Sequence, residues 1–144
     1  MDAETTPPPG AGAARRAARL QTPRLRREQT TMVVMLRLYC RDQHSAEPAD
    51  GDGLCAACAA LLAYSRKRLA ACPFGPEKPT CVNCQIHCYG PQQREATRTV
   101  MRYAGPRMLL RHPVLALLHV VDGQRPAPPK PRGSAQAATE VKEP

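Results

Sequence analysis

The sequence predicts an all-α fold: a small helical domain stapled by Cys/His metal sites, with a proline-rich cysteine loop and disordered tails. Three observations lead to this prediction. Apolar residues recur at three- and four-residue steps, no segment alternates as a strand does, and seven cysteines are crowded into 144 residues that include no Trp and one Phe. A domain with so few large apolar residues has a small core, so it needs a staple.

Two segments at the ends of the chain differ from the rest in composition. Residues 1–23 and 124–144 are rich in Pro, Ala and Gly, and neither contains an aromatic residue or an apolar period. Such segments bury too little apolar surface to offset the entropy lost on ordering. We therefore predict a disordered N-terminal tail at 1–23, a disordered Pro-rich C-terminal tail at 124–144, and a cysteine-rich helical domain at 24–123.

Two helices are predicted in the first half of this domain. Apolar residues from Leu25 to Tyr39 follow helical steps, and Pro23 precedes them, where a helix start tolerates proline. Polar turn-forming residues at 45–53 separate this helix from a second one, which begins near Cys55. Because the connection is short, the two helices are expected to be antiparallel.

Two more helices are predicted after the cysteine-rich loop. One runs from about 92 to 103, and Gly105-Pro106 is expected to end it. A last helical stretch ends at Asp122-Gly123. Its apolar run at 108–121 is interrupted by an arginine, a histidine and a proline, so we interpret it as a buried helix and not as a membrane span.

Four metal-ligand residues lie around the first two helices. Cys40 and His44 are four residues apart, so a helix that continues through them would place both on one face. Cys55 and Cys58 stand at the start of the second helix, where the helix dipole favours a thiolate. Three cysteines and one histidine in this order are typical of a closed tetrahedral zinc site. Two alternatives are a buried, inert Cys40 with an exposed His44, and a dithiol redox pair, which lacks its usual βαβ context.

A second ligand set lies in the proline-rich loop. Its four sulfurs follow the pattern Cys72-x8-Cys81-x2-Cys84-x3-Cys88. Four sulfurs are enough for one tetrahedral ion. His87 is a further candidate, either as a substitute ligand or as a hydrogen-bond donor to a ligand. Together the two sets use every cysteine and His44, which makes eight ligands for two zinc ions.

The same cysteines suit two other uses. All-sulfur ligation suits an iron–sulfur cluster as well as zinc, and the spacing of Cys81, Cys84 and Cys88 is close to a ferredoxin pattern. One iron–sulfur cluster at Cys72, Cys81, Cys84 and Cys88 is therefore the alternative cofactor. Disulfides fit less well because no apolar leader marks the chain for secretion and seven cysteines leave one unpaired. We expect a reducing, cytoplasmic environment.

The chain is basic, with 21 Lys and Arg against 12 Asp and Glu and a formal net charge of +9. Metal-bound thiolates would lower that charge, so it is weak evidence for a nucleic-acid partner. Arg94, Arg98 and Arg102 follow four-residue steps and form a basic stripe, either a solvated helix face or a nucleic-acid surface. No catalytic motif stands out, so enzymatic activity stays open. A protein partner is expected, and no membrane.

Several short motifs closely resemble a known family. They are Leu38-Tyr39-Cys40, Leu54-Cys55-x2-Cys58, Cys72-Pro73-Phe74-Gly75, Lys78-Pro79-Thr80-Cys81, Cys84-x2-His87-Cys88-Tyr89, the RYAGPRM stretch at 102–108 and His112-Pro113. Over about residues 25–123 the sequence resembles the nitrous-oxide-stimulated promoter family, YgbA type. Gln85 stands where we expect Pro in relatives, a departure that touches no proposed ligand.

The resemblance implies a small bacterial cytoplasmic protein whose gene is induced by nitrogen oxides. Thiolates are reversible targets of S-nitrosylation, and a metal–thiolate site that reacts in this way can lose its metal. We therefore hypothesise a metal–thiolate protein, with zinc or an iron–sulfur cluster, that senses nitrogen oxides or protects or repairs a cellular target. Two other functions stay open: a zinc-stapled nucleic-acid-binding regulator and an iron–sulfur redox or repair enzyme.

Overall fold

The computed structural model describes residues 10–44, 47–48, 51–80, 84, 88–126 and 128–129. These residues form five α-helices, one short 3-10 helix and no strand, which confirms the predicted all-α class. The elements are, in chain order, α1 (Ala11–Leu20), α2 (Pro23–Gln43), α3 (Ala56–Ala70), η1 (Gly75–Glu77), α4 (Pro91–Arg111) and α5 (Pro113–Gly123). Among the described helices, none is both long and apolar enough to cross a membrane.

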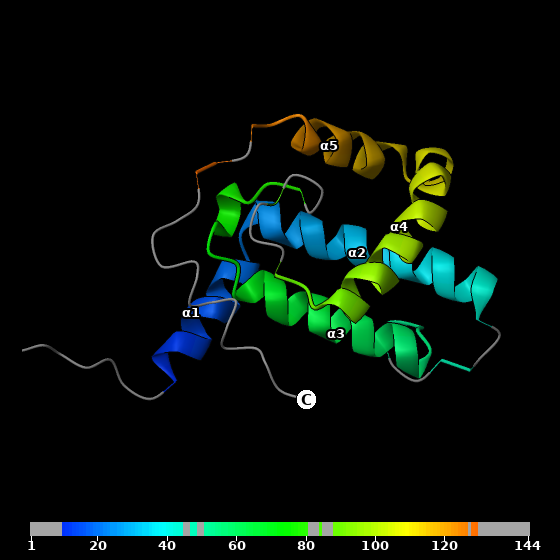
Figure 1. The fold of residues 1–144 in the computed structure, drawn as a ribbon, viewed down its shortest axis with the longest axis horizontal. Coiled ribbons are helices and arrows are strands. Elements are labelled where there is room, and N and C mark those ends of the chain that lie inside the picture. Colours follow the sequence, from blue (N-terminus) through cyan, green and yellow to red (C-terminus); the bar gives the residue numbers. More distant parts are fainter. Residues whose placement is uncertain are drawn as a thin grey trace, which may run out of the picture.

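Helix α2 is the centre of the fold and contacts each of the other helices (Figure 1). Its apolar face carries the fully buried Leu25 and Leu36, as the helical spacing predicts. Leu36 belongs to a core cluster with Leu54 and Leu62 around α3 and with a buried stripe on α4. Each fully buried leucine contributes about 1.5–3 kcal/mol by leaving water. The core therefore holds the end of α2 against the start of α3.

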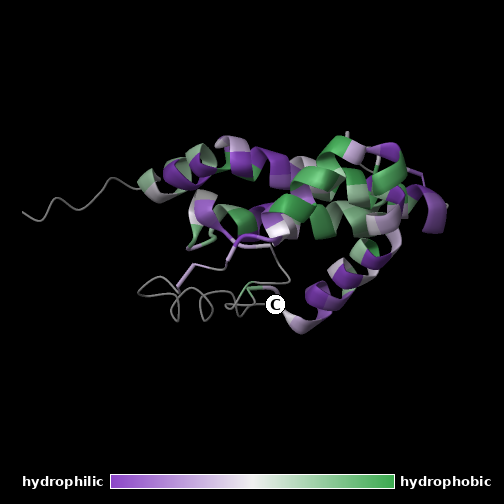
Figure 2. Ribbon diagram, turned by 90° about the horizontal axis from the view of Figure 1, so that it is seen from above, coloured by the Kyte–Doolittle hydropathy of each residue, from purple (hydrophilic) through white to green (hydrophobic). Residues whose placement is uncertain are grey.

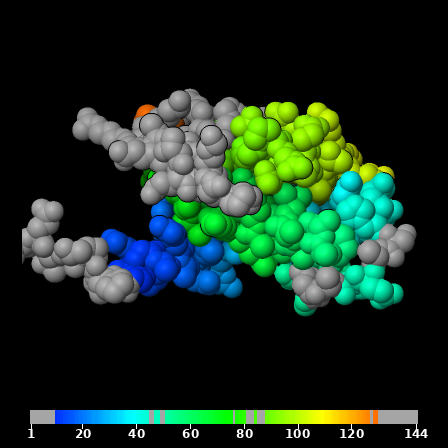
Figure 3. Space-filling view, turned by 60° about the horizontal axis from the view of Figure 1, so that its bottom comes forward, coloured from blue at the N-terminus to red at the C-terminus, as the bar shows by residue number. Residues whose placement is uncertain are grey.

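Helix α1 lies where the sequence predicts a disordered tail. Figure 3 shows it at one end of the molecule, beside α3, which it contacts. The Arg19 guanidinium donates a hydrogen bond of 2.7 Å to the Cys72 carbonyl. Gly75, with φ of 56°, lets the loop approach Arg19, because a Cβ there would come within 3.0 Å of the guanidinium. The prediction of disorder is wrong for 11–20: an Ala/Arg-rich segment has high helix propensity even without an apolar period.

Helix α4 continues through Gly105 and Pro106, where the sequence predicts a break, and ends at Arg111. The prediction is wrong because packing outweighs the local cost of proline. Ala104 is fully buried and Met108 is 3% exposed, so both sides of the proline are anchored in the core. The chain breaks instead at His112, whose φ of −138° and ψ of 61° are not helical. A proline disfavours helical backbone angles at the residue before it. Because Pro113 follows His112, the helix breaks at His112.

Helix α5 is much less buried than predicted. Seven large apolar side chains on α5 and the last turn of α4 are more than a third exposed. They are Leu109, Leu110, Val114, Leu117, Leu118, Val120 and Val121. Figure 2 looks onto this side of the molecule, and much of the helical ribbon there is green. The interpretation of 108–121 as a buried helix is wrong for these residues, since α5 packs through one narrow face.

A charged network anchors the end of α5 to the start of α2. Asp122 is only 3% exposed and forms ion pairs with Arg27 at 3.0 Å and Arg24 at 3.3 Å. Glu28 pairs with Arg24 and, at 3.6 Å, with Lys78. Burial would raise the pKa of Glu28, but the neighbouring Lys78 and Arg24 lower it overall. The network therefore joins α2, α5 and the loop after η1.

Candidate metal centre

The end of α2 and the start of α3 bring four predicted ligands together. Cys40 lies in the last turn of α2, and His44 caps that helix. Cys55 is the N-cap residue of α3, and Cys58 lies in its first turn. Gly53, with a φ of 76°, turns the chain into α3 through a left-handed conformation that favours glycine. The turn is held by Arg37, whose Nε donates to the Asp52 carbonyl at 2.7 Å.

The ligand atoms of these four residues all lie within 4.8 Å of one another, so the group can hold a metal ion. His44 Nδ1 is 3.3 Å from Sγ of Cys55 and 3.3 Å from Sγ of Cys58. The Cys55 backbone N–H donates to Cys40 Sγ at 3.3 Å. A tetrahedral ion with Zn–S bonds of about 2.3 Å holds its sulfurs about 3.8 Å apart. A contraction of about 1 Å or less would therefore complete such a site.

The three cysteines of this group are buried, with exposures of 4% for Cys40, 6% for Cys55 and 4% for Cys58. They belong to the hydrophobic core, so the sulfurs are shielded from water. His44 is partly exposed, and its ring meets the Tyr39 ring edge-on at 5.3 Å. Four protein ligands in such an environment suit a closed structural site better than a catalytic site with an open position.

The thiols of this group differ in acidity because of their places on α3. The Cys58 backbone N–H donates to Cys55, and this hydrogen bond, with others from its neighbours, lowers the pKa of Cys55 to about 6. Burial, together with the neighbouring cysteines, raises the pKa of Cys58. One thiolate is therefore ready at neutral pH, whereas Cys58 must lose a proton when a metal binds.

Helix α4 covers the outer side of this group through Tyr103. The Tyr103 ring meets Tyr39 edge-on at 5.7 Å, and its hydroxyl donates to Asp42 Oδ2 at 2.8 Å. Hydrogen bonds from Arg41 and from Tyr103 lower the pKa of Asp42 to about 2. Asp42 is therefore a carboxylate at neutral pH. It holds Tyr103 beside Tyr39, whose ring meets His44 edge-on.

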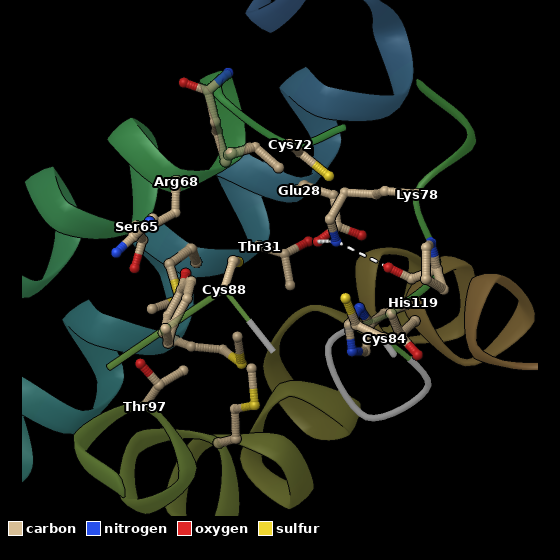
Figure 4. Close-up of a pocket in the computed structure, with 18 of the residues that line it drawn as sticks. Glu28, Thr31, Ser65, Arg68, Cys72, Lys78, Cys84, Cys88, Thr97 and His119 are labelled. Carbon is tan, nitrogen blue, oxygen red and sulfur yellow. Dashed lines mark hydrogen bonds and ion pairs between the residues drawn. The ribbon is translucent and has the colours of Figure 1, made fainter. Parts of the chain in front are cut away.

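The second predicted ligand set is only partly described. Cys81 and the candidate His87 lie outside the described residues, whereas Cys72, Cys84 and Cys88 lie within them. These three residues line a cavity of about 650 Å³ (Figure 4). Their sulfurs do not form a group like the one at α2 and α3, which is the one such cluster among the described residues. The structure thus supports one site for a single ion, and the second zinc site stays a prediction.

The predicted arginine stripe lies on α4. Arg98 and Arg102 are 57% and 75% exposed in their side chains, and both pair with Glu95, at 3.7 and 3.9 Å. Arg94 donates to the Tyr89 carbonyl at 3.4 Å. Part of the positive charge is therefore balanced within the helix itself. The stripe has the geometry of a solvated helix face, and a nucleic-acid role for it stays a prediction.

The family model for nitrous oxide-stimulated promoter matches residues 23–132. The chain belongs to this family. It is 46% identical over 110 residues to a protein of Escherichia coli (strain K12) named "Uncharacterized protein YgbA". The matched residues make up 75% of this chain and 88% of that protein. No solved structure shows significant similarity. The resemblance found in the cysteine motifs is thus confirmed.

Sequence reasoning missed several residues that line the cavity beside the cysteine loop. Arg68 and Thr97 are buried there, and each has a side-chain atom without a hydrogen-bond partner among the described residues. His119, which the sequence marks only as a helix residue, lines it too. The sequence contains a signal of burial for Arg68 only. Arg68 lies seven residues after Leu61 and three after Ser65, so helical spacing places it on the same, buried side of α3 as those two residues.

Proposed function

We propose that the protein is a zinc–thiolate domain of the cellular response to nitrogen oxides. The observation that carries this proposal is the convergence of Cys40, His44, Cys55 and Cys58 within 4.8 Å. Nitrogen and sulfur ligands in a closed, four-coordinate arrangement favour zinc. The family's description as nitrous oxide-stimulated supports the biological context.

Nitrogen oxides would act on this centre through its sulfurs. A nitrosating nitrogen oxide such as dinitrogen trioxide transfers NO⁺ to a cysteine thiolate and releases nitrite, and the modified sulfur no longer serves as a good zinc ligand. The centre joins the end of α2 to the start of α3, so loss of zinc would loosen the contact between these helices. In this way the domain would sense nitrogen oxides, or protect or repair a cellular target, through a change in its own structure.

The direct test exposes the purified, zinc-loaded protein to a nitric oxide donor and follows zinc release with a chromogenic chelator. We expect zinc to be released together with a fall in helical circular dichroism, and both changes to reverse when thiol reductant and zinc are restored. Zinc that stays bound while the thiols of Cys55 and Cys58 are modified would contradict the proposed chemistry.

A growth test connects this chemistry to the cell. Bacteria without their own copy of the gene would receive the wild-type chain, the Cys58→Ser chain or the Arg102→Ala chain, and would then grow with a nitric oxide donor. We expect protection from the wild type and from Arg102→Ala, whose side chain is 75% exposed and offers no metal ligand. Equal protection by Cys58→Ser would separate the cellular role from the metal centre.

A further inference from the structure

The cavity beside the cysteine loop lies between α2, α3, α4 and α5 and has a volume of about 650 Å³ (Figure 4). This volume is in the range of sites that bind small molecules. Much of its wall is apolar, and its lining includes the buried Met32, Met35, Leu62 and Phe74. Such a wall favours a ligand with an apolar body, because burial of apolar surface on both partners is favourable.

One buried cation in this wall has no counter-charge. Arg68 is 9% exposed, it forms no ion pair with a described carboxylate, and its Nε has no hydrogen-bond partner. The guanidinium lies 5.2 Å from the centre of the Tyr64 ring, a contact that attracts a cation but carries no negative charge. A buried charge is costly unless it is paired. Arg68 therefore lowers the stability of the empty protein, and a bound anion would offset that loss.

The other charges of the wall do not supply the missing anion. Glu28 is the carboxylate among the described lining residues, and it already pairs with Lys78 at 3.6 Å. Arg66 and Arg98, which also line the cavity, pair with acids outside it at 3.4 and 3.7 Å. Arg68 is thus the buried lining cation whose charge is unbalanced within the part of the chain that the structure describes. One such charge calls for a singly charged anion.

Helix α4 adds a second polar group without a partner. Thr97 is 4% exposed, and its hydroxyl makes no hydrogen bond with the described residues. In Figure 4, Arg68 extends from α3 and Thr97 from α4, so two walls of the cavity each carry one such group. A few polar groups in an otherwise apolar pocket are what fixes the orientation of a small ligand.

We propose that this cavity binds a small organic monocarboxylate with an apolar body. Arg68 pairs with the carboxylate, the apolar side chains enclose the body, and Thr97 donates a hydrogen bond to the ligand. A guanidinium suits a carboxylate because its N–H groups can bond both oxygens at once. An inorganic anion would balance the charge but leave the apolar wall without contacts. Binding changes no covalent bond and involves no metal, so this site can fail without the proposed zinc–thiolate centre, and the reverse.

The test titrates the full, zinc-loaded chain with cinnamate in an isothermal titration calorimeter, and we expect one cinnamate per chain. Cinnamyl alcohol is the neutral control with the same apolar body, and acetate is the control with the same charge and almost no body. The alcohol should bind at least about tenfold more weakly than cinnamate, because it lacks the charged partner of Arg68. Acetate should also bind at least about tenfold more weakly, because it buries little apolar surface.

Arg68→Met separates a ligand-binding arginine from a merely structural one. It removes the buried charge and keeps an apolar side chain, so the ligand-free chain should melt a few degrees higher than the wild type. The same variant should bind cinnamate at least about tenfold more weakly and cinnamyl alcohol unchanged. Arg102→Met is the matched control: its side chain is 75% exposed and lies outside the described lining of the cavity. It should change neither the melting temperature nor the affinity.

Two further variants locate the bound probe. Thr97→Val keeps the shape of the side chain and removes the hydroxyl, so it should weaken cinnamate binding by about threefold or more. Leu110→Ser changes the exposed apolar surface at the end of α4, where the side chain is 86% exposed. It should leave cinnamate binding unchanged, because that surface is separate from the cavity lining.

Four results would overturn the proposal. The first is a wild-type chain that does not bind cinnamate, and the second is equal affinity for cinnamate and cinnamyl alcohol. The third is an Arg68→Met chain that binds cinnamate as the wild type does, or that melts lower without ligand. The fourth is cinnamate binding that Leu110→Ser removes, which would place the probe on the exposed surface. The comparison of the three probes on the wild type applies even if a variant does not fold.

Discussion

Replacement of Cys58 by serine should remove most of the stability that zinc gives to the fold. The residue is 4% exposed, and its Sγ lies 3.3 Å from His44 Nδ1 within the ligand group. Loss of outer hydrogen-bond partners alone costs metal sites 10- to 100-fold in affinity, so loss of a ligand should cost about 100-fold or more. At a free zinc concentration well above the dissociation constant, a 100-fold loss removes about 2.7 kcal/mol of stabilisation.

This loss is large for a domain of this size. One kcal/mol shifts the melting temperature of a 60–100-residue domain by about 4–8 °C, so the zinc-dependent part of the shift should fall by about 10–20 °C. The assay is thermal unfolding by circular dichroism at a buffered free zinc concentration, with and without zinc. Subtracting the zinc-free value removes the separate cost of burying a serine hydroxyl, which is about 1–3 kcal/mol.

Val100→Ser is the matched control, because Val100 is also buried, at 2% exposure, but belongs to neither predicted ligand set. It should leave the zinc-dependent shift unchanged even if it lowers stability overall. The reasoning is refuted if Cys58→Ser keeps the full zinc-dependent shift, or if Val100→Ser loses as much of it as Cys58→Ser does.

Three further predictions follow from the same structure. Asp122→Asn should destabilise the fold by about 3 kcal/mol in urea unfolding, because it removes the buried carboxylate that pairs with the partly buried Arg24 and Arg27. Glu95→Gln, at an exposed pair, should cost under about 1 kcal/mol. In the metal-free protein, thiolate absorption should rise with a midpoint near pH 6, and this step should be missing in Cys55→Ser. Because the pKa of Cys55 in the folded chain lies below the ordinary value of 9.0, the stability that its ionisation contributes is complete above pH 9 and is lost as the pH falls through about 6. Leu110→Ser, at a side chain 86% exposed, should change the melting temperature by no more than a few degrees, and a larger loss would show that this surface is buried in an assembly.

The parts of the structure that depend on short-range patterns could be predicted from the sequence. Helical spacing placed Leu25 and Leu36 in the core, and both are fully buried. The four-residue step from Cys40 to His44 and the two-residue gap before Cys58 predicted which ligand atoms would meet. The buried leucines and the Cys55–Cys58 spacing depend on helix geometry, whereas His44 lies just past the end of α2, with φ of −118° and ψ of 117°, and meets the cysteines because α2 packs against α3.

The remaining features depend on contacts between distant segments. Pro106 predicts a helix break, but the buried Ala104 and Met108 keep α4 continuous on both sides of it. Nothing local indicates that α1 finds a partner in the Cys72 carbonyl, 53 residues further along the chain. The cavity likewise forms from four helices and a loop, so the unpaired Arg68 is visible only once they are assembled.

X-ray absorption spectroscopy at the zinc edge tests the central claim most directly. The full chain would be loaded with a single equivalent of zinc, and the Cys58→Ser chain would be measured beside it. Our account predicts three sulfur ligands at about 2.3 Å and one nitrogen at about 2.0 Å in the wild type, with one sulfur fewer in the variant. Four sulfurs in both chains, or a shell of oxygen and nitrogen alone, would contradict zinc binding by Cys40, His44, Cys55 and Cys58.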